Sequence, residues 1–235
     1  LLLESQQGSA PRIVAVMDVS NGADALLARP PLTRLADLQG RRLGVEDTAL
    51  GAFMLSRVLE RAGLARSDID LRSLEVNEHE RAFLEGRVDA VISFEPVRTK
   101  LMAREARVLF DSSEIPGEIV DVLGVKREHL GSQPEQAALL LRGLFRALDH
   151  MKAHPEEAAR RMAMRQGVTP QEFQASLRGL QLPDLQANLT LLEGPSSLRV
   201  TGQALAEVMV QRKLILRPVD VAALFHPHAL RELSR

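Results

Sequence analysis

The fold is decided by the stretch LGVEDTALGAFMLSRVLERAG, residues 43–63, which joins a short apolar segment to an amphipathic one. Residues 43–45 have the apolar character of a buried strand. The segment that begins at Thr48 or Ala49 has helical periodicity and stops at Gly63. The face predicted to be buried consists of Met54, Leu55, Val58, Leu59 and Ala62. A strand that runs into such a helix is the unit from which α/β sheets are built.

The same alternation continues on both sides of this unit, up to residue 125. Strands are predicted at residues 12–19, 25–28, 71–76, 88–93, 107–110 and 119–125. Helices are predicted at residues 78–85 and after Pro96. Strand–helix–strand order at this spacing predicts parallel pairing, and the strands that follow Gly40 and Gly86 are expected in one sheet.

Beyond Lys126 the sequence predicts helices and no strand. Ser132 and Glu135 form a capping-box pattern that opens a long helix. Pro155 and Thr169 mark the starts of two more, and a fourth is predicted at residues 204–212. The buried stripe of the long helix is predicted to be Ala137, Leu140, Leu141, Leu144, Phe145, Leu148 and Met151. We therefore expect an α/β protein with a helical carboxyl-terminal region.

Composition excludes several classes of function. The chain has 235 residues with 30 Lys and Arg against 31 Asp and Glu, so no basic nucleic-acid or membrane-binding surface is indicated. It has no cysteine, which excludes disulfides, thiolate metal sites and thiol nucleophiles. Tyr and Trp are also absent. The longest apolar runs, such as residues 137–141, are far shorter than the ~20 residues that span a bilayer.

The usual signatures of catalysis and metal binding are missing. The sequence contains no G-x-S-x-G elbow, Walker loop or G-x-G-x-x-G fingerprint. His150 and His154, and likewise His226 and His228, lack a carboxylate at a recognised metal-ligand spacing. We therefore expect a protein that is not an enzyme and that uses neither a metal nor a cofactor.

Three loops between predicted elements carry the candidate ligand-binding residues. The first loop supplies Ser20, Asn21 and Gly22, whose polar groups and free amides suit a small polar ligand. An Asn-Gly hairpin turn between two strands explains these residues at least equally well.

The second loop leads from the strand at residues 43–45 into its helix. Thr48, Leu50 and Gly51 lie where open amides and the positive end of the helix dipole favour an anion. The alternative is that Thr48, or the residue before it, serves only as the N-cap of the helix. Acidic residues at positions 46 and 47 oppose a bare anion, so a neutral or zwitterionic ligand is favoured over phosphate.

The third loop follows the strand predicted at residues 88–93, at the edge where open α/β sheets hold their ligands. Glu95 precedes a proline, which disfavours a helical conformation and allows its carboxylate to face a ligand. Glu118 is a second carboxylate of this kind, after an Ile-Pro-Gly run. The alternative is that both are solvated loop charges.

Several segments together resemble the substrate-binding proteins of ABC importers, in the group that includes nitrate, sulfonate, taurine and thiamine-precursor binders. They are DVSNGADA at residues 18–25, LADLQGRRLGV at 35–45, GRVDAV at 86–91 followed by Glu95 and Pro96, and FDSSEIPGE at 110–118. The patterns ADL-x-G-x-x-hydrophobic-x-V and G-x-V-D-A are fairly specific for the type 2 periplasmic-binding fold. The resemblance covers nearly the whole chain.

The resemblance implies two α/β lobes that hold the ligand between them and enclose it by hinge closure. Residues 1–31 and 122–235 are then expected to form the first lobe with the helical tail, and residues 32–121 the second. Members of this group normally begin with a signal peptide and a strand–helix–strand unit. Residues 1–8 have the character of a helix end instead, so the amino-terminal part is expected to be missing.

The function implied is capture of a small nitrogen- or sulfur-containing organic solute for ABC permease subunits, without nucleic-acid binding or membrane insertion. The location implied is periplasmic, or lipid-anchored outside the inner membrane. A fungal enzyme of this family that builds the thiamine pyrimidine needs a cysteine-rich motif, which this sequence lacks. The alternative function is a ligand-sensing domain of a signalling receptor or regulator.

The candidate residues also suggest the chemistry of the solute. Two carboxylates, Glu95 and Glu118, facing a helix amino terminus suit a ligand with both an amine-like donor and an acceptor. We therefore expect an aminosulfonate or an amino-pyrimidine precursor, and not nitrate. The lack of Tyr and Trp argues against a flat heterocycle, although Phe53 or Phe94 can stack on one.

Overall fold

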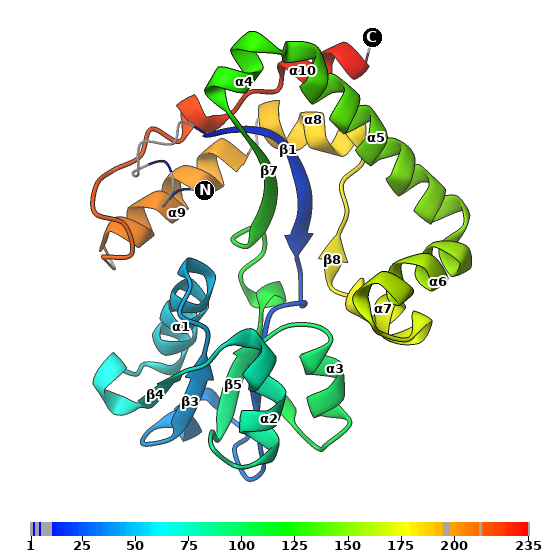
Figure 1. The fold of residues 1–235 in the computed structure, drawn as a ribbon. Coiled ribbons are helices and arrows are strands. Elements are labelled where there is room, and N and C mark those ends of the chain that lie inside the picture. The colour runs from blue at the N-terminus through cyan, green and yellow to red at the C-terminus, as the bar shows by residue number, and fades with distance from the viewer. Residues whose placement is uncertain (1, 3–4, 6–10, 195–197, 212, 235) are drawn as a thin grey trace. The chain divides into compact units, whose positions relative to one another are not determined.

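The computed structural model describes residues 2, 5, 11–194, 198–211 and 213–234, and Figure 1 shows its helices and strands. The chain divides into two compact units. Unit 1 consists of residues 1–20, 117–170 and 180–235, and unit 2 consists of residues 21–116 and 171–179. The helix end expected at residues 1–8 falls mostly outside the described residues.

Unit 2 contains a five-stranded sheet. Its strand order is β4 (Asp70–Ser73), β3 (Arg42–Val45), β5 (Ala90–Ser93), β2 (Ala25–Ala28) and β6 (Arg107–Asp111). β3 pairs parallel with β4 and β5, which confirms that the strands after Gly40 and Gly86 share one sheet. β2 pairs antiparallel with β5 and β6, so the expected parallel pairing is wrong for this strand. The chain enters β2 from a loop, without a crossover helix that would return it to the edge where β5 begins.

The helices that pack on this sheet are α1 (Ala49–Ala62), α2 (His79–Leu84) and α3 (Val97–Met102). α1 begins and ends as predicted: Thr48 is its N-cap, and Gly63 ends it in the left-handed conformation with φ 67°. The most deeply buried large side chains of α1 are Phe53, Met54, Leu55, Val58 and Leu59. Shorter elements of unit 2 are the 3-10 helices Leu35–Leu38, Arg66–Asp68, Val76–Glu78 and Ser112–Glu114, together with most of α7 (Pro170–Ser176).

Unit 1 is built around one long strand. β1 (Pro11–Ser20) lies between β7 (Val120–Lys126) and β8 (Leu180–Gln181) and pairs antiparallel with both. Helices supply the rest of the unit: α4 (Arg127–Ser132), α5 (Pro134–Ala153), α6 (Pro155–Gln166), α8 (Leu185–Glu193), α9 (Leu198–Gln211), a 3-10 helix at Ala222–Leu224 and α10 (His228–Leu233). Residues of β1, α5 and α10 form the main core cluster. No helix in the described part of the chain combines the length and the apolar character needed to cross a bilayer.

Three predictions for the carboxyl half are wrong. β8 is a strand beyond Lys126, but it is only two residues long and has no periodicity to detect. Ser132 ends α4 instead of capping α5, and its Oγ donates to the Glu128 carbonyl 2.9 Å away. Leu140 is 54% exposed, whereas Leu141 is fully buried, because only one narrow face of α5 packs on the core.

The boundaries of the two units differ from the boundaries expected for the lobes. Residues 21–31 belong to unit 2, because β2 makes its hydrogen bonds with β5 and β6. Residues 117–121 belong to unit 1, because β7 pairs with β1 from Val120 onward. Strand pairing, which joins residues distant in sequence, therefore decides where each unit begins.

A buried asparagine of α8 satisfies the backbone at an irregular position of β1. The register of β1 against β7 shifts on either side of the Ala15 and Val16 positions. The Asn188 side chain accepts a hydrogen bond from Val16 N at 2.7 Å and donates to Val16 O at 3.2 Å. Asn188 is fully buried and also donates to the Pro183 carbonyl. The amide therefore replaces bonds that a regular ladder would make.

Replacing Asn188 with Leu should lower the free energy of unfolding by about 2–4 kcal/mol, because both polar groups of Val16 lose their partner inside the core. Urea denaturation followed by circular dichroism measures this change. Gln186→Leu, at an exposed position of the same helix, is the matched control and should change stability by less than about 0.5 kcal/mol. Equal losses in the two variants would contradict the role given to Asn188.

Candidate functional site

One edge of the unit 2 sheet gathers the ends of several strands. The parallel register of β3 and β5 pairs Gly44 with Val91, so the carboxyl ends of these strands lie together. Ala25 of the antiparallel strand β2 pairs with Ser93 and with Asp111, which brings the amino end of β2 and the carboxyl end of β6 to the same edge. Ligands of open α/β sheets bind at such an edge. We therefore build the candidate site from the loops that leave it.

The amino end of α1 is the best-defined part of this edge. Thr48 Oγ1 accepts a hydrogen bond from Gly51 N at 3.1 Å, and Thr48 O accepts one from Ala52 N at 3.0 Å. Thr48 is therefore the N-cap, as the alternative interpretation proposed. The N–H groups of Ala49 and Leu50 precede these bonds, and within the described part of the chain they have no hydrogen-bond partner, so we call them the open amides of the first turn. An N-cap and an anion-binding helix end are compatible uses of the same turn.

Gly51 is required by the close approach of this turn to the end of β3. A Cβ atom at position 51 would overlap the carbonyl oxygen of Glu46 and lie 2.9 Å from its Cγ atom. Gly51 is buried, and Leu50 beside it is half-buried. The glycine therefore lets the strand turn directly into the helix, which sets the direction of the open amides.

The loop between β1 and β2 is not a hairpin turn. The two strands belong to different sheets, so the Asn-Gly hairpin alternative is wrong. Asn21 N donates to Gly179 O at 2.6 Å, and Gly22 N donates to Ser112 Oγ at 2.7 Å. Gly22 has φ 106°, a backbone conformation that residues other than glycine rarely adopt. These bonds hold the loop beside the carboxyl end of β6.

Glu95 has partners on the helix that follows it. Its carboxylate accepts hydrogen bonds from Thr99 N at 3.1 Å and from Thr99 Oγ1 at 3.0 Å, and Arg98 Nη1 lies 3.5 Å away. The side chain is only 6% exposed, so it is not a solvated loop charge. Glu95 therefore accepts a hydrogen bond from a backbone N–H in the first turn of α3.

The structure brings Asn21, Gly22, Thr48, Leu50, Gly51 and Glu95 into unit 2. Ser20 and Glu118 belong to unit 1. Ser20 is buried at the end of β1, where its N–H donates to Ile119 O at 3.0 Å. Glu118 is half-buried just before β7. Binding roles for these two residues remain predictions from the sequence.

A buried histidine beneath the same edge was not predicted. His79 is fully buried, and its Nδ1 lies 3.0 Å from the Oγ of Ser93, the last residue of β5. Its Nε2 has no hydrogen-bond partner among the described residues. Burial lowers the pKa of His79, and the nearby Glu46 carboxylate opposes that shift only in part. His79 shares the buried face of α2 with Ala82 and Phe83, and its burial was not predicted because the residues directly before and after it are charged.

Comparison with known proteins gives one family and a shared fold. The family model described as NMT1/THI5 like matches residues 4–158. The aliphatic sulphonate binding protein SsuA from Escherichia coli is 18% identical, with a TM-score of 0.78 over 94% of this chain and 71% of that one. The alkanesulfonate-binding protein SsuA from Xanthomonas axonopodis pv. citri, bound to MOPS, is 20% identical, with a TM-score of 0.77 over 96% and 76%.

The desulfurization enzyme DSZB has a similar structure, with 18% identity and a TM-score of 0.72 over 98% of this chain and 81% of that one. A search of curated protein sequences gives no match. Likeness at these identities shows the fold, and the predicted two-part α/β periplasmic-binding fold is confirmed. Binding proteins and an enzyme share this fold, so fold alone does not assign chemistry.

The stability of the protein should fall on acidification because of His79. Burial holds the pKa of His79 below the ordinary value of 6.5, so the unfolded chain takes up the proton first. Above about pH 6.5, His79 does not lower the free energy of unfolding. As the pH falls below that value, the unfolded chain binds a proton at His79 more readily than the folded chain, and the free energy of unfolding decreases. Urea denaturation across about pH 7.5 to 5 measures this slope.

His79→Gln is the informative variant, because glutamine retains a hydrogen-bonding group for Ser93 and does not titrate. We expect a smaller loss of stability on acidification in this variant than in the wild type. The pKa of His226 in unit 1 is also lowered, and both proteins retain that residue, so the comparison isolates His79. Identical pH slopes would refute this assignment.

Proposed function

Because the chain belongs to the NMT1/THI5-like family, we propose that it is the solute-binding component of an ABC importer. Its solute is a small organic molecule with a sulfonate or similar oxyanion group. The observation that supports this proposal is the amino end of α1, where the open amides of Ala49 and Leu50 lie next to the carboxyl end of β3, at the kind of edge where open α/β sheets bind ligands.

The chemistry of this helix end suits a sulfonate. Its oxygens are hydrogen-bond acceptors only, and they match the N–H groups and the positive dipole end of a helix of this length. Thr48 and Gly51 fix the direction of the amides without using them. Recognition therefore rests on the main chain of the first turn.

Two acidic residues beside this turn favour a solute that also carries a donor. Glu46 is half-buried and Asp47 is exposed, directly before the N-cap. An amine-bearing sulfonate offsets this negative charge, whereas nitrate has no donor to do so. Of the two solutes expected from the sequence, this favours an aminosulfonate over an amino-pyrimidine precursor, and it leaves Glu95 with its role in α3.

The names of two relatives support a sulfonate as the class of solute. Both SsuA structures are named for sulfonate binding, one from Escherichia coli and one from Xanthomonas axonopodis pv. citri. The partner of such a component is an importer permease, and its working location is the periplasm.

Isothermal titration with taurine, a short alkylsulfonate and nitrate tests the proposal, and Leu50→Glu is the decisive variant. A carboxylate in the first turn stabilises the helix but repels a bound anion, so the fold should persist while sulfonate affinity falls by at least about tenfold. Leu50→Gln is the matched neutral control and should retain most of the affinity. Absence of sulfonate binding to the folded wild type, or equal affinities in the two variants, would overturn the proposal.

Glu95→Gln separates a capping role from a binding role. The glutamine loses the charge that faces the first turn of α3, so we expect a lower melting temperature, by a few degrees, equivalent to about 0.5–1 kcal/mol. Sulfonate affinity should stay within about twofold of the wild type, because the carboxylate is occupied by Thr99. A loss of affinity without a loss of stability would instead assign Glu95 to the solute.

A further inference from the structure

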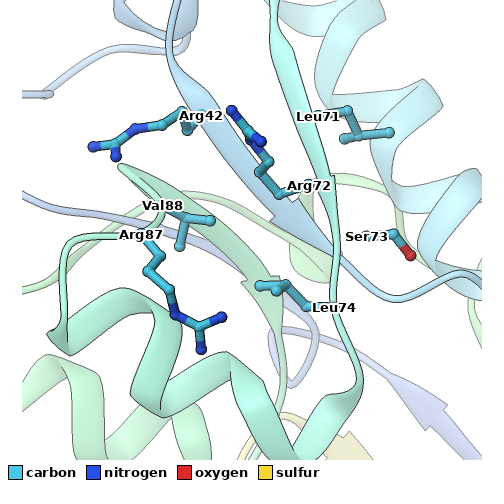
Figure 2. A pocket seen from close by; sticks show the side chains of 7 residues that line it. All are labelled: Arg42, Leu71, Arg72, Ser73, Leu74, Arg87 and Val88. Atoms are coloured by element: carbon cyan, nitrogen blue, oxygen red, sulfur yellow. The ribbon is translucent and has the colours of Figure 1, made fainter.

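Unit 2 also contains an open pocket of about 600 Å³, which Figure 2 shows from close by. It is lined by the start of β3, by β4 with the residue after it, and by the segment before β5. The lining residues are Arg42, Leu71, Arg72, Ser73, Leu74, Arg87 and Val88. None of the candidate residues of the solute site is among them, and the volume is that of a small-molecule site.

The floor of the pocket is apolar because Gly44 has no side chain. A Cβ atom at position 44 would lie 2.7 Å from Leu74 Cδ1 and 3.3 Å from Val88 Cγ1. The glycine therefore lets these two side chains lie close against β3. Leu74 also packs on the buried cluster that contains Val88. An apolar group bound here would contact a firm hydrophobic surface.

The charged residues that line the pocket are all arginines. Arg42, Arg72 and Arg87 come from three different segments, and no acidic side chain is part of the lining. Their side chains are 40%, 53% and 42% exposed, so a ligand can reach each of them. The lining therefore presents three guanidinium groups and no carboxylate, and the carboxylates that pair with these arginines lie outside it.

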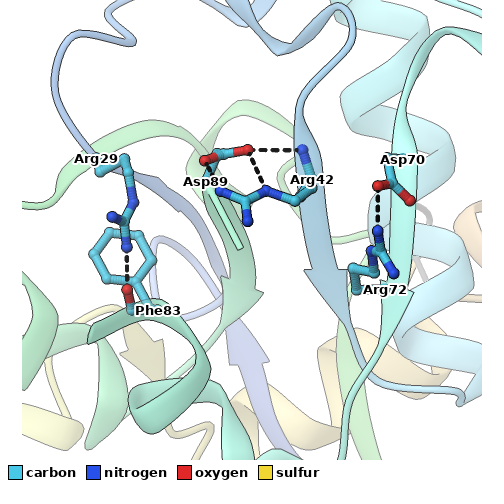
Figure 3. A network of polar contacts seen from close by, with 6 residues as sticks. All are labelled: Arg29, Arg42, Asp70, Arg72, Phe83 and Asp89. Atoms are coloured by element: carbon cyan, nitrogen blue, oxygen red, sulfur yellow. Dashed lines mark hydrogen bonds and ion pairs between the residues drawn. The ribbon is translucent and has the colours of Figure 1, made fainter. Parts of the chain in front are cut away.

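Carboxylates outside the lining hold two of these guanidinium groups in place, as Figure 3 shows. Arg42 donates through Nε at 3.0 Å and Nη2 at 2.7 Å to Asp89, and Arg72 Nη2 donates to Asp70. A guanidinium has more N–H donors than these bonds use. Each carboxylate therefore orients an arginine and leaves other donors for a ligand.

The third arginine is held in the same way. Arg87 Nε donates to Glu85 Oε2 at 3.1 Å, and its Nη1 lies 3.9 Å from Glu78 Oε1.

An alternative explanation for these arginines is that charges on an edge strand such as β4 prevent unwanted strand pairing. That explanation applies to Arg72, but Arg42 lies on the inner strand β3 and Arg87 lies outside the sheet strands.

We propose that this pocket is a second ligand site, which binds a small organic anion with two or more carboxylate or phosphate groups on a compact apolar body. Guanidinium forks match the geometry of these groups, and oriented forks lose less freedom on binding. Groups from three segments favour an anion with several charged groups over a single small ion. The apolar floor favours a hydrocarbon or aromatic body between those groups.

Isothermal titration of the full chain with benzenetricarboxylate tests the proposal, with phenyl phosphate, benzoate and inorganic phosphate as comparison ligands. The tricarboxylate should bind at least about tenfold more tightly than benzoate, which has one charged group, and than phosphate, which has no apolar body. The ratio of tricarboxylate to phenyl phosphate affinity distinguishes a carboxylate site from a phosphate site; both results support the proposal.

Arg72→Gln and Arg87→Gln should each weaken tricarboxylate binding by about tenfold. Arg66→Gln removes the same charge at an exposed position of unit 2 outside the pocket, and it should change the affinity by less than about twofold. Equal losses in all three variants, or no binding to a wild type with a normal melting curve, would overturn the proposal. Loss of binding in Leu50→Glu would also overturn it, because the anion would then occupy the end of α1.

Discussion

The carboxylate of Asp89 fixes the start of β3 against the segment that enters β5. It accepts hydrogen bonds from the backbone N of Arg42 and from two nitrogens of its guanidinium, while Asp89 N donates to Arg42 O at 2.8 Å. These bonds lower the pKa of Asp89 and raise that of Arg42. A slip of one residue would turn every side chain to the other face and break these bonds, so the pair helps to hold the register of the parallel strands.

The carboxyl ends of these strands and one face of the sheet both depend on that register. At the carboxyl end it brings the turn into α1 beside the turn that follows β5, which is where the solute site is proposed. On the face of the sheet it places Gly44 under Leu74 and Val88, which forms the floor of the arginine-lined pocket. The ion pair between Arg42 and Asp89 thus supports two proposed sites, one built on main-chain amides and one on side chains.

Local signals in the sequence were sufficient for α1 and for the strands of unit 2. Thr48 and Gly63 mark the helix ends by their own conformational preferences, and the structure uses both as predicted. The direction of β2 and the existence of β8 depend instead on partners far along the chain. No window of sequence contains those partners, so periodicity does not detect them.

The candidate site likewise contains residues that local sequence predicts and residues that it does not. The position of Thr48 and Gly51 at a helix end is local and was predictable. The role of Glu95 was harder to predict, because a carboxylate before a proline has the same sequence signal whether it faces a ligand or the helix after it. The burial of Asn188 and His79 was not predicted, since the hydrogen-bond partners of a buried polar group lie far away in the sequence.

The proposed solute site depends on the path of the backbone more than on particular side chains. Its donors are the amides of a first helical turn, and the side chains that matter there are an N-cap hydroxyl and a glycine. Several residue types can cap a helix, and any residue except proline supplies an amide. A site of this kind can persist while most side chains change. In the proposed site, selectivity would come from the side chains around the turn, among which are the acidic pair Glu46 and Asp47.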